Sequence, residues 1–191
     1  MYSLSGRLNS IGFNTLIVLT ALSALNFSSV YFDPKQPLVL KQMVIKEYDT
    51  FVKDNFINED AISFTFDFKA DLRPIVNWNT NILFMYISCE YNTTKSKFNR
   101  VTIWDQRVQR FEEQDHIIDL VGEYPEYYLT DINKDLRDQD IKCYLNWEQM
   151  PIVGMNYGSR VLIGEFRTPK NYISKSKRKY HPGPDGRNHN Y

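Results

Sequence analysis

The sequence places few side chains in arrangements that could perform chemistry, and its three histidines are the first candidates. Nucleophilic catalysis needs a Ser or Cys beside a base that a third group orients. His116 lies in a strand-like segment, and His181 and His189 lie near the carboxyl end, each without such neighbours in sequence. The G-x-S-x-G turn of serine hydrolases does not occur. We therefore predict no catalytic residue in this chain.

Carboxylates and potential metal ligands give no stronger signal. The acidic pairs Glu112-Glu113 and Asp138/Asp140 lie in charged segments, where solvation by water explains them. The motifs CxxC, HExxH and GxxxxGK[ST] are absent from the sequence. One set in the tail has suitable residue types, but a segment broken by Pro and Gly would not hold ligands in place. That set is His181, Asp185 and His189. We predict neither a bound metal nor a cofactor.

One modification motif stands out. Asn92-Thr93-Thr94 fits the N-x-[ST] acceptor pattern and lies in a polar loop between two predicted strands, where an acceptor must be accessible. We predict N-glycosylation at Asn92, which requires this loop to face the lumenal side of a membrane. Asn26-Phe27-Ser28 fits the same pattern but lies in an apolar stretch, so we set it aside.

The two cysteines, Cys89 and Cys143, allow at most one disulfide. Each lies on the apolar phase of a predicted strand, so both thiols should point into one core. Two such thiols could meet in an oxidising compartment. Buried free cysteine is also common, because it behaves as a small apolar residue. The sequence leaves both alternatives open.

A long uncharged stretch near the amino terminus predicts a membrane anchor. No Asp, Glu, Lys or Arg occurs between Arg7 and Asp33. A helix over Ile11–Val30 would cover about 30 Å, the thickness of the hydrocarbon core of a bilayer. We predict a transmembrane helix at 11–32 after a short leader at 1–10. Small and polar residues on this helix fall near one face, which is typical of helix–helix packing in lipid, although a short helix can also tolerate them. This face contains Gly12, Thr15, Leu19, Ser23 and Asn26.

A cleaved signal peptide is the main rival to the anchor. Arg7 is basic and residues 21–23 resemble a cleavage site, but the uncharged run continues well beyond that site, which favours a retained helix. The count of Lys and Arg near the span favours a cytosolic carboxyl domain. The leader is short, however, and large domains cross membranes largely regardless of charge, so this count leaves the orientation open. The lysines after the span are Lys35, Lys41 and Lys46.

The rest of the chain has the composition of a β-domain. Aromatic residues make up 15% of the sequence, with 13 Tyr and 12 Phe, and such residues favour pleated, half-buried surfaces. Apolar and polar residues alternate over Ile62–Asp71, whereas Asn81–Tyr91 is apolar on both phases, which predicts a central strand covered on both faces. The other predicted strands are 39–48, 100–108, 116–121, 127–129, 141–147 and 160–166, with a short helix at 72–77.

Several strands at short spacing predict an all-β fold, an antiparallel β-sandwich, over residues 33–172. Residues 173–191 are basic and contain Pro and Gly, and we predict a flexible tail there. The chain has 23 Lys plus Arg and 23 Asp plus Glu, so its net charge is zero. No global field would therefore attract it to nucleic acid, and we expect no nucleic-acid partner.

The motifs, taken in order along the chain, resemble the signal peptidase complex subunit 3 family. The resemblance covers about residues 1–172 and is more specific than any one motif. The matching segments are 66–72 (FDFKADL), 78–80 (WNT), 87–91 (ISCEY), 99–105 (NRVTIWD), 144–147 (YLNW) and 150–151 (MP).

This resemblance implies a non-catalytic accessory subunit of the endoplasmic reticulum signal peptidase, which supports the serine protease subunit that removes signal peptides from nascent secretory proteins. It implies a cytosolic amino terminus at 1–10, a type II signal anchor at 11–32 and a lumenal β-sandwich. The expected partners are the catalytic signal peptidase subunit and the other subunits of the complex, in one hetero-oligomer within the lipid bilayer.

Two departures from the family pattern matter. Relatives can carry a sequon just before the strand at 145–147, but here Asp140-Ile141-Lys142 occupies that place, so glycosylation depends on Asn92. The tail from Ile173 has no counterpart that we recognise.

Two other functions remain alternatives. One is a secreted or membrane-anchored β-sandwich binding module with an unrelated ligand, and the other is an enzyme that depends on His116. For the accessory subunit, we expect exposed aromatic residues and sheet edges to contact the partner. The sequence does not say which ones, and Trp78, Trp104 and Trp147 fit an interface or the core equally well.

Overall fold

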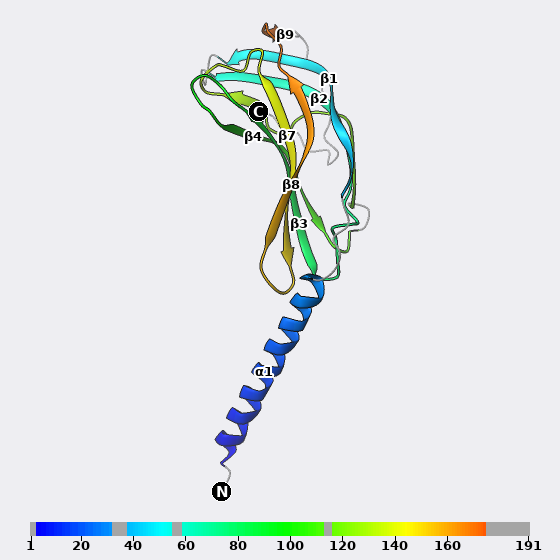
Figure 1. Ribbon diagram of the computed structural model, residues 1–191, viewed down its shortest axis with the longest axis vertical. Coiled ribbons are helices and arrows are strands. Elements are labelled where there is room, and N and C mark those ends of the chain that lie inside the picture. The colour runs from blue at the N-terminus through cyan, green and yellow to red at the C-terminus, as the bar shows by residue number, and fades with distance from the viewer. Residues whose placement is uncertain (1–2, 32–37, 55–58, 113–115, 175–191) are drawn as a thin grey trace.

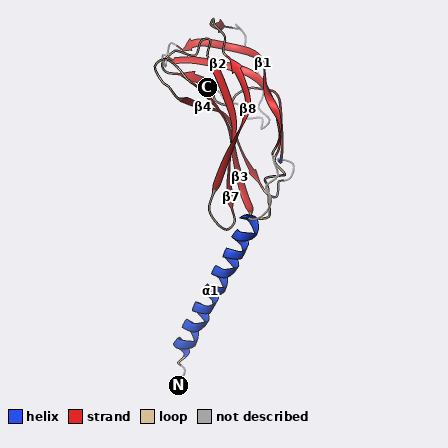
Figure 2. Ribbon diagram, viewed as in Figure 1, coloured by secondary structure: helices blue, strands red, loops and turns tan. Residues whose placement is uncertain are grey.

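A computed structural model of the chain describes residues 3–31, 38–54, 59–112 and 116–174 and shows one helix attached to a β-domain (Figure 1). The helix α1 (Leu4–Tyr31) has 28 residues, or about 42 Å at 1.5 Å per residue. It stands away from the strands (Figure 2), and its large apolar side chains are exposed along its length. By length and composition it can cross a membrane.

The helix begins seven residues before the predicted start at Ile11. Ser3 explains the earlier start, because its Oγ accepts a hydrogen bond from the Gly6 backbone N–H at 3.2 Å. A serine in this place satisfies one of the free N–H groups of the first helical turn. Arg7 therefore lies within the helix rather than before it.

The β-domain consists of two antiparallel sheets that pack face to face. In the first sheet the strand order is β5-β2-β1-β9, with β6 also paired to β2, and in the second it is β4-β3-β7-β8. The strands of the first sheet are β1 (Val39–Asp54), β2 (Glu59–Asp71), β5 (Ile117–Glu123), β6 (Leu129–Asp131) and β9 (Ile173–Ser174). Those of the second are β3 (Thr80–Tyr91), β4 (Asn99–Gln109), β7 (Asp140–Pro151) and β8 (Tyr157–Arg167). The predicted all-β architecture is thus confirmed.

The core lies between the two sheets, as the alternation in the sequence predicts. Every second residue of β2 from Ile62 to Ala70 is fully buried, and the phenylalanines among them face the second sheet. Burying four or five such side chains contributes on the order of 10 kcal/mol before chain entropy is subtracted. The inner phases of β3 and β7 complete this core with Leu83, Met85, Ile87, Cys89, Ile141, Cys143 and Leu145.

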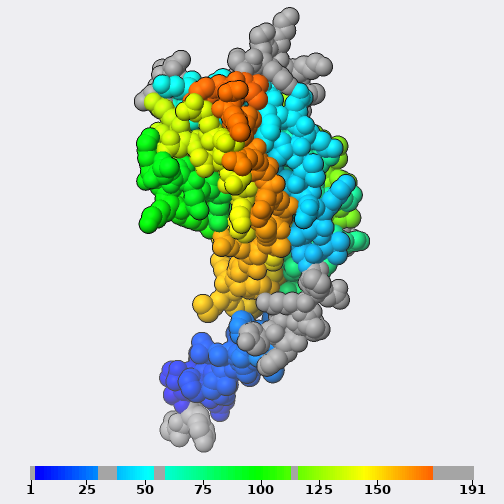
Figure 3. Space-filling model, turned by 45° about the horizontal axis from the view of Figure 1, so that its top comes forward, coloured from blue at the N-terminus to red at the C-terminus, as the bar shows by residue number. Residues whose placement is uncertain are grey.

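One long edge of the sandwich is closed where β8 meets β1, although the two strands belong to different sheets. Figure 3 shows β8 (orange) between β7 (yellow) and β1 (light blue). Gly164 permits the approach, because a Cβ atom there would lie 2.9 Å from the Met43 carbonyl oxygen. Nearby, the Tyr48 hydroxyl donates a hydrogen bond to the Arg167 carbonyl oxygen at 2.8 Å. These contacts fix the relative position of the sheets.

Two short elements differ from the prediction. Residues 72–77 form turns rather than a helix, because Asp71 accepts a hydrogen bond from the Arg73 backbone N–H at 3.1 Å and Asn77 accepts one from Asn79 at 2.9 Å. Such side-chain turns compete with helix formation, and six residues are too few to offset them. The strand predicted at 127–129 starts only at Leu129.

The β-domain also extends further along the chain than predicted. β9 pairs with β1, placing Ile173 opposite Phe51 and Ser174 opposite Thr50. These two residues therefore belong to the first sheet rather than to the predicted tail. Residues 175–191, the rest of that tail, lie outside the described residues.

Candidate partner-binding face

The central strand β3 has apolar side chains on both of its faces. Its inner phase, which includes Met85 and Ile87, is fully buried in the core. Its outer phase carries Ile82, Phe84 and Tyr86, which are only half-buried. We predicted cover on both faces, and this is wrong for the described part of the chain, where only the inner side is covered by the other sheet. The outer phase owes its apolar character to something other than the core of this domain.

The outer side chains of three neighbouring strands form one apolar surface, which we call the aromatic face. It consists of Phe84 and Tyr86 from β3, Tyr144 from β7 and Leu162 from β8. The register places Tyr144 directly opposite Leu162, and the rings of Phe84 and Tyr86 have centroids 5.8 Å apart. Tyr86 pairs with Asn146, so Tyr144, two residues before Asn146 on β7, lies diagonally across from Tyr86 on the same surface.

A buried amide fixes the centre of the aromatic face. The Asn146 Nδ2 donates hydrogen bonds to the Ser88 Oγ at 2.7 Å and to the carbonyl oxygens of Tyr144 at 3.1 Å and Tyr86 at 3.3 Å. Both polar side chains are buried although they lie on the outer phase, and buried polar groups need such partners. The sequence reasoning missed Asn146, whose signal was a lone amide between Leu145 and Trp147.

Charged residues border the aromatic face on more than one side, because Arg107 and Asp105 of β4 lie opposite Phe84 and Tyr86. The Glu90 carboxylate accepts hydrogen bonds from the Arg100 guanidinium at 2.6 Å and from the Arg160 guanidinium at 2.8 Å. The Arg160 guanidinium also lies over the Tyr144 ring, 4.8 Å from its centroid. Aromatic residues and arginine together are the composition typical of protein interfaces and their hot spots.

The outer face of the other sheet has a different character. It carries ion pairs between Lys46 and Asp67 at 2.8 Å and between Lys69 and Asp119 at 2.5 Å. The hydrogen bond from Lys46 lowers the pKa of Asp67 from its ordinary value. Exposed pairs of this kind are solvated and typical of a surface in contact with water. Of the two outer faces, the aromatic face is therefore the better candidate for a partner.

The predicted glycosylation site lies in the turn between β3 and β4. Asn92 and Thr94 are exposed, whereas Thr93 is buried and its backbone N–H donates to the Ser96 carbonyl oxygen at 2.8 Å. The acceptor is thus accessible, in a turn held by its own hydrogen bonds. Its modification stays a prediction.

The two cysteines lie on neighbouring strands of one sheet. Cys89 of β3 is the direct register partner of Cys143 of β7. Their Cα atoms are 4.1 Å apart, and the structure joins the side chains in a disulfide. The sequence placed both residues on inner phases but could not show that β3 and β7 are adjacent, since 54 residues separate the cysteines.

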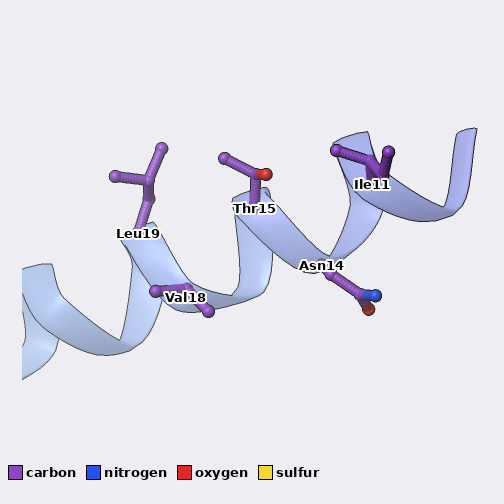
Figure 4. A pocket seen from close by; sticks show the side chains of 5 residues that line it. All are labelled: Ile11, Asn14, Thr15, Val18 and Leu19. Atoms are coloured by element: carbon purple, nitrogen blue, oxygen red, sulfur yellow. The ribbon is translucent and has the colours of Figure 1, made fainter. Parts of the chain in front are cut away.

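On α1 the structure shows a shallow hollow near the predicted packing face (Figure 4). Ile11, Thr15 and Leu19 follow one another along the helix, and Asn14 and Val18 line the hollow beside them. Thr15 and Leu19 belong to the predicted face. Gly12, Ser23 and Asn26 do not line the hollow, and a role of this face in helix packing stays a prediction.

Several hydroxyls of α1 donate hydrogen bonds to backbone carbonyl oxygens of the same helix. The hydroxyls of Thr20 and Ser28 donate to the carbonyl oxygens of Leu16 and Ala24, each at 2.8 Å. Hydroxyls bonded in this way can face lipid without a second protein partner. Polarity on this helix therefore does not by itself require a neighbouring helix.

The candidates for chemistry do not come together. His116 is buried with its Nε2 3.3 Å from the Gln109 carbonyl oxygen, and Asp138 is paired with Arg167 at 2.8 Å. Within the described ranges no group of three or more His, Cys, Asp or Glu side chains could hold a metal ion. His181, Asp185 and His189 lie outside those ranges.

Comparison with known proteins gives a consistent result. A family model described as "Signal peptidase subunit" matches residues 1–171. The chain is 28% identical over 177 residues to "Signal peptidase complex subunit 3" of Dictyostelium discoideum, covering 92% of this chain and 99% of the relative. It is 30% identical to the protein of the same name from Caenorhabditis briggsae, over 81% and 86% of the two chains. The Saccharomyces cerevisiae protein of that name is 32% identical over 54% and 56%.

Proposed function

The chain belongs to the signal peptidase subunit family, and from this membership we propose that it is a non-catalytic accessory subunit of the signal peptidase complex in the endoplasmic reticulum membrane. In this role it assembles with the catalytic serine protease subunit and the other subunits in one hetero-oligomer. It orients the protease relative to the bilayer, so that the cleavage site of a signal peptide meets the active site at a fixed height. Holding reacting groups in place in this way is itself a contribution to rate.

The proposed topology places residues 1–10 in the cytosol, the span at 11–32 and the β-domain at 33–172 in the lumen. The apolar, exposed surface of α1 supports the span. The accessible sequon at Asn92 supports a lumenal β-domain, because N-linked glycans are added on that side. Cys89 and Cys143 fit the same compartment, since disulfides persist where the environment is oxidising.

A single observation carries the proposed interaction with the protease subunit. The central strand β3 is apolar on both phases, yet the described chain covers only one of them. Antiparallel sheets that face water normally carry polar residues on the open side. We therefore assign the aromatic face as the surface that the protease subunit covers.

Affinity purification of the full chain from detergent-solubilised membranes tests this assignment. The variant F84S/Y144S removes two rings from the aromatic face, and the protease subunit should co-purify at a reduced ratio, by about tenfold or more if the pair is a hot spot. Thermal unfolding of each purified variant establishes that the domain is folded.

The matched control is V44S/I117S, which removes two exposed apolar side chains from the first sheet, 48% and 44% exposed. This control should retain the protease subunit at the wild-type ratio. Equal retention by both variants would show that the partner binds elsewhere. Recovery of wild-type protein without any signal peptidase subunit would instead favour a binding module with an unrelated ligand.

A further inference from the structure

We propose that the helix-proximal end of the β-domain is a lipid-binding rim that inserts four apolar side chains into the headgroup layer of the bilayer. The rim consists of Trp78, Phe111, Ile152 and Met155. The proposal rests on the proposed membrane span of α1, but it does not depend on any partner subunit.

The strand registers bring these four residues to one end of the domain. Thr80 at the start of β3 pairs with Pro151 at the end of β7, and Ile82 pairs with Gln109 at the end of β4. The segments that precede or follow these positions therefore emerge together. Figure 1 shows that α1 leaves the domain at the same end.

A buried asparagine holds the rim in shape. The Ile152 backbone N–H donates to the Asn79 carbonyl oxygen at 2.7 Å, and the Asn79 side chain exchanges two hydrogen bonds with the Val153 backbone, at 2.8 and 3.1 Å. Arg110 also donates to the Trp78 carbonyl oxygen. Asn79 is only 2% exposed, so the turn after β7 is fastened to the turn before β3. The exposed side chains are thus presented by an ordered scaffold.

The rim side chains are large, apolar and strongly exposed. Exposed apolar clusters of this kind mark interaction sites on protein surfaces. Tryptophan beside arginine is also the composition of the membrane–water interface, where the ring lies at headgroup level and the cation reaches phosphate. The Arg110 guanidinium lies 4.4 Å from the centroid of the Phe111 ring. The exposed fractions are 51% for Trp78, 82% for Phe111, 59% for Ile152 and 80% for Met155.

The contact between the β7–β8 turn and α1 fixes the depth of the rim. Gly154 has a φ of +112°, and a Cβ atom there would lie 2.8 Å from the Phe27 Cδ2. The turn therefore rests against Phe27, which lies inside the uncharged stretch that ends before Asp33. Phe27 is about 4.5 Å along the helix from Val30, the end of the stretch that covers the hydrocarbon core. A turn packed on Phe27 therefore lies where the hydrocarbon meets the headgroup layer when α1 spans the membrane.

This geometry identifies lipid as the occupant of the rim. A segment that touches the membrane-embedded part of α1 meets the lipid around this helix at the same depth. The rim is also distinct from the aromatic face, which is formed by the middle and distal parts of the second sheet. One molecule thus presents a lipid-facing end and a protein-facing side.

Tryptophan fluorescence of the full chain in lipid nanodiscs tests the proposal, because both membrane surfaces of a nanodisc are open to solvent. The probe lipid is phosphatidylcholine brominated near the headgroup end of its acyl chains, compared with the unbrominated lipid. Trp78 is exposed and Trp104 is buried, so Trp78 should supply most of the emission that bromine quenches. W78F should therefore lower the bromine-quenched emission by about twofold or more.

The matched control moves the exposed ring to the other end of the domain. W78F/F98W places it in the β3–β4 turn, where Phe98 is 60% exposed. The emission of the introduced ring should be quenched by aqueous acrylamide and not by bromine. A second variant, I152E/M155E, should weaken bromine quenching of Trp78 while the circular dichroism spectrum stays unchanged.

Two outcomes would overturn the proposal. One is equal bromine quenching of wild type and W78F, with Trp78 open to acrylamide. The other is unchanged quenching in I152E/M155E. Alkaline washing of vesicles tests the span separately: a chain that stays in the membrane but shows unquenched Trp78 overturns the rim alone. A chain that washes off overturns the rim and the proposed span together.

Discussion

Asn79 and Asn146 act at the scale of single residues, because each buried amide hydrogen-bonds to groups on neighbouring segments. Asn79 joins two turns at the helix-proximal end, and Asn146 occupies the centre of the aromatic face. An unpaired buried polar group costs about 1–3 kcal/mol, so each amide is tied to its partners. Both lie within segments on which the family resemblance depends, WNT and YLNW.

Tyr48 is one of the tyrosines whose raised pKa should affect stability at alkaline pH. It is partly buried between Phe64 and Phe166, with ring centroids 6.4 and 6.5 Å away. Burial raises the pKa of Tyr48 from 10.0 to about 12.

We expect a loss of stability at alkaline pH that depends on Tyr48. Because the folded state holds the proton more tightly, the contribution is fully present below pH 10 and is lost as the pH rises toward about 12. Urea unfolding across this range measures the effect. Y48F, which retains the ring without the ionisable hydroxyl, should show a smaller loss. Parallel loss in the two proteins would mean that other tyrosines dominate.

At the scale of elements, β3 is the most informative strand. It is central in its sheet, as its apolar sequence predicts, and its inner phase forms part of the core. It also carries Cys89, which is joined to Cys143 on β7. Two strands far apart in sequence are thus linked both by a hydrogen-bonded ladder and by a covalent bond.

Loss of this disulfide should destabilise the β-domain. The bond closes a long loop, and cross-linking residues 54 positions apart restricts the unfolded chain by about 4 kcal/mol in the entropic account. Equilibrium urea unfolding of the full chain in detergent, with and without reductant, measures the difference. C89A/C143A should have the same midpoint in both conditions. A wild-type midpoint that reductant leaves unchanged, with reduction established by mass spectrometry, would contradict the prediction.

At the scale of the whole molecule, the proposed topology gives the two ends of the β-domain different surroundings. The rim lies beside α1, whereas the turn that carries Asn92 lies at the other end of β3. Twelve residues of strand separate the two ends, or roughly 40 Å. In the proposed topology, Asn92 therefore lies well clear of the bilayer.

Glycosylation in microsomes should report this topology. The wild-type chain should show an endoglycosidase-sensitive shift in mobility, which N92Q and T94A abolish because each destroys the acceptor pattern. T94S keeps the hydroxyl and should retain the shift. Absence of the shift in wild type, together with digestion of the β-domain by protease added outside sealed vesicles, would place the domain in the cytosol.

The sequence by itself determined the two-part organisation of this protein, because hydrophobic patterning is local information. The uncharged stretch before Asp33 indicated the helix, and the alternation over Ile62–Asp71 indicated a half-buried strand. Capping by Ser3 moved the start of α1 to Leu4, and pairing of β9 with β1 moved the end of the β-domain to Ser174. The ordered motifs also identified the family, which the family match confirms.

Only the tertiary structure decided which strands are neighbours and which faces remain open. Strand order depends on contacts across dozens of residues, and no local pattern records it. The pairing of β3 with β7 brought Cys89 to Cys143 and created the aromatic face, and the joining of separate turns by Asn79 created the rim. An apolar outer phase looks the same in sequence whether its own chain or another molecule covers it, because burial depends on what is packed against it in space.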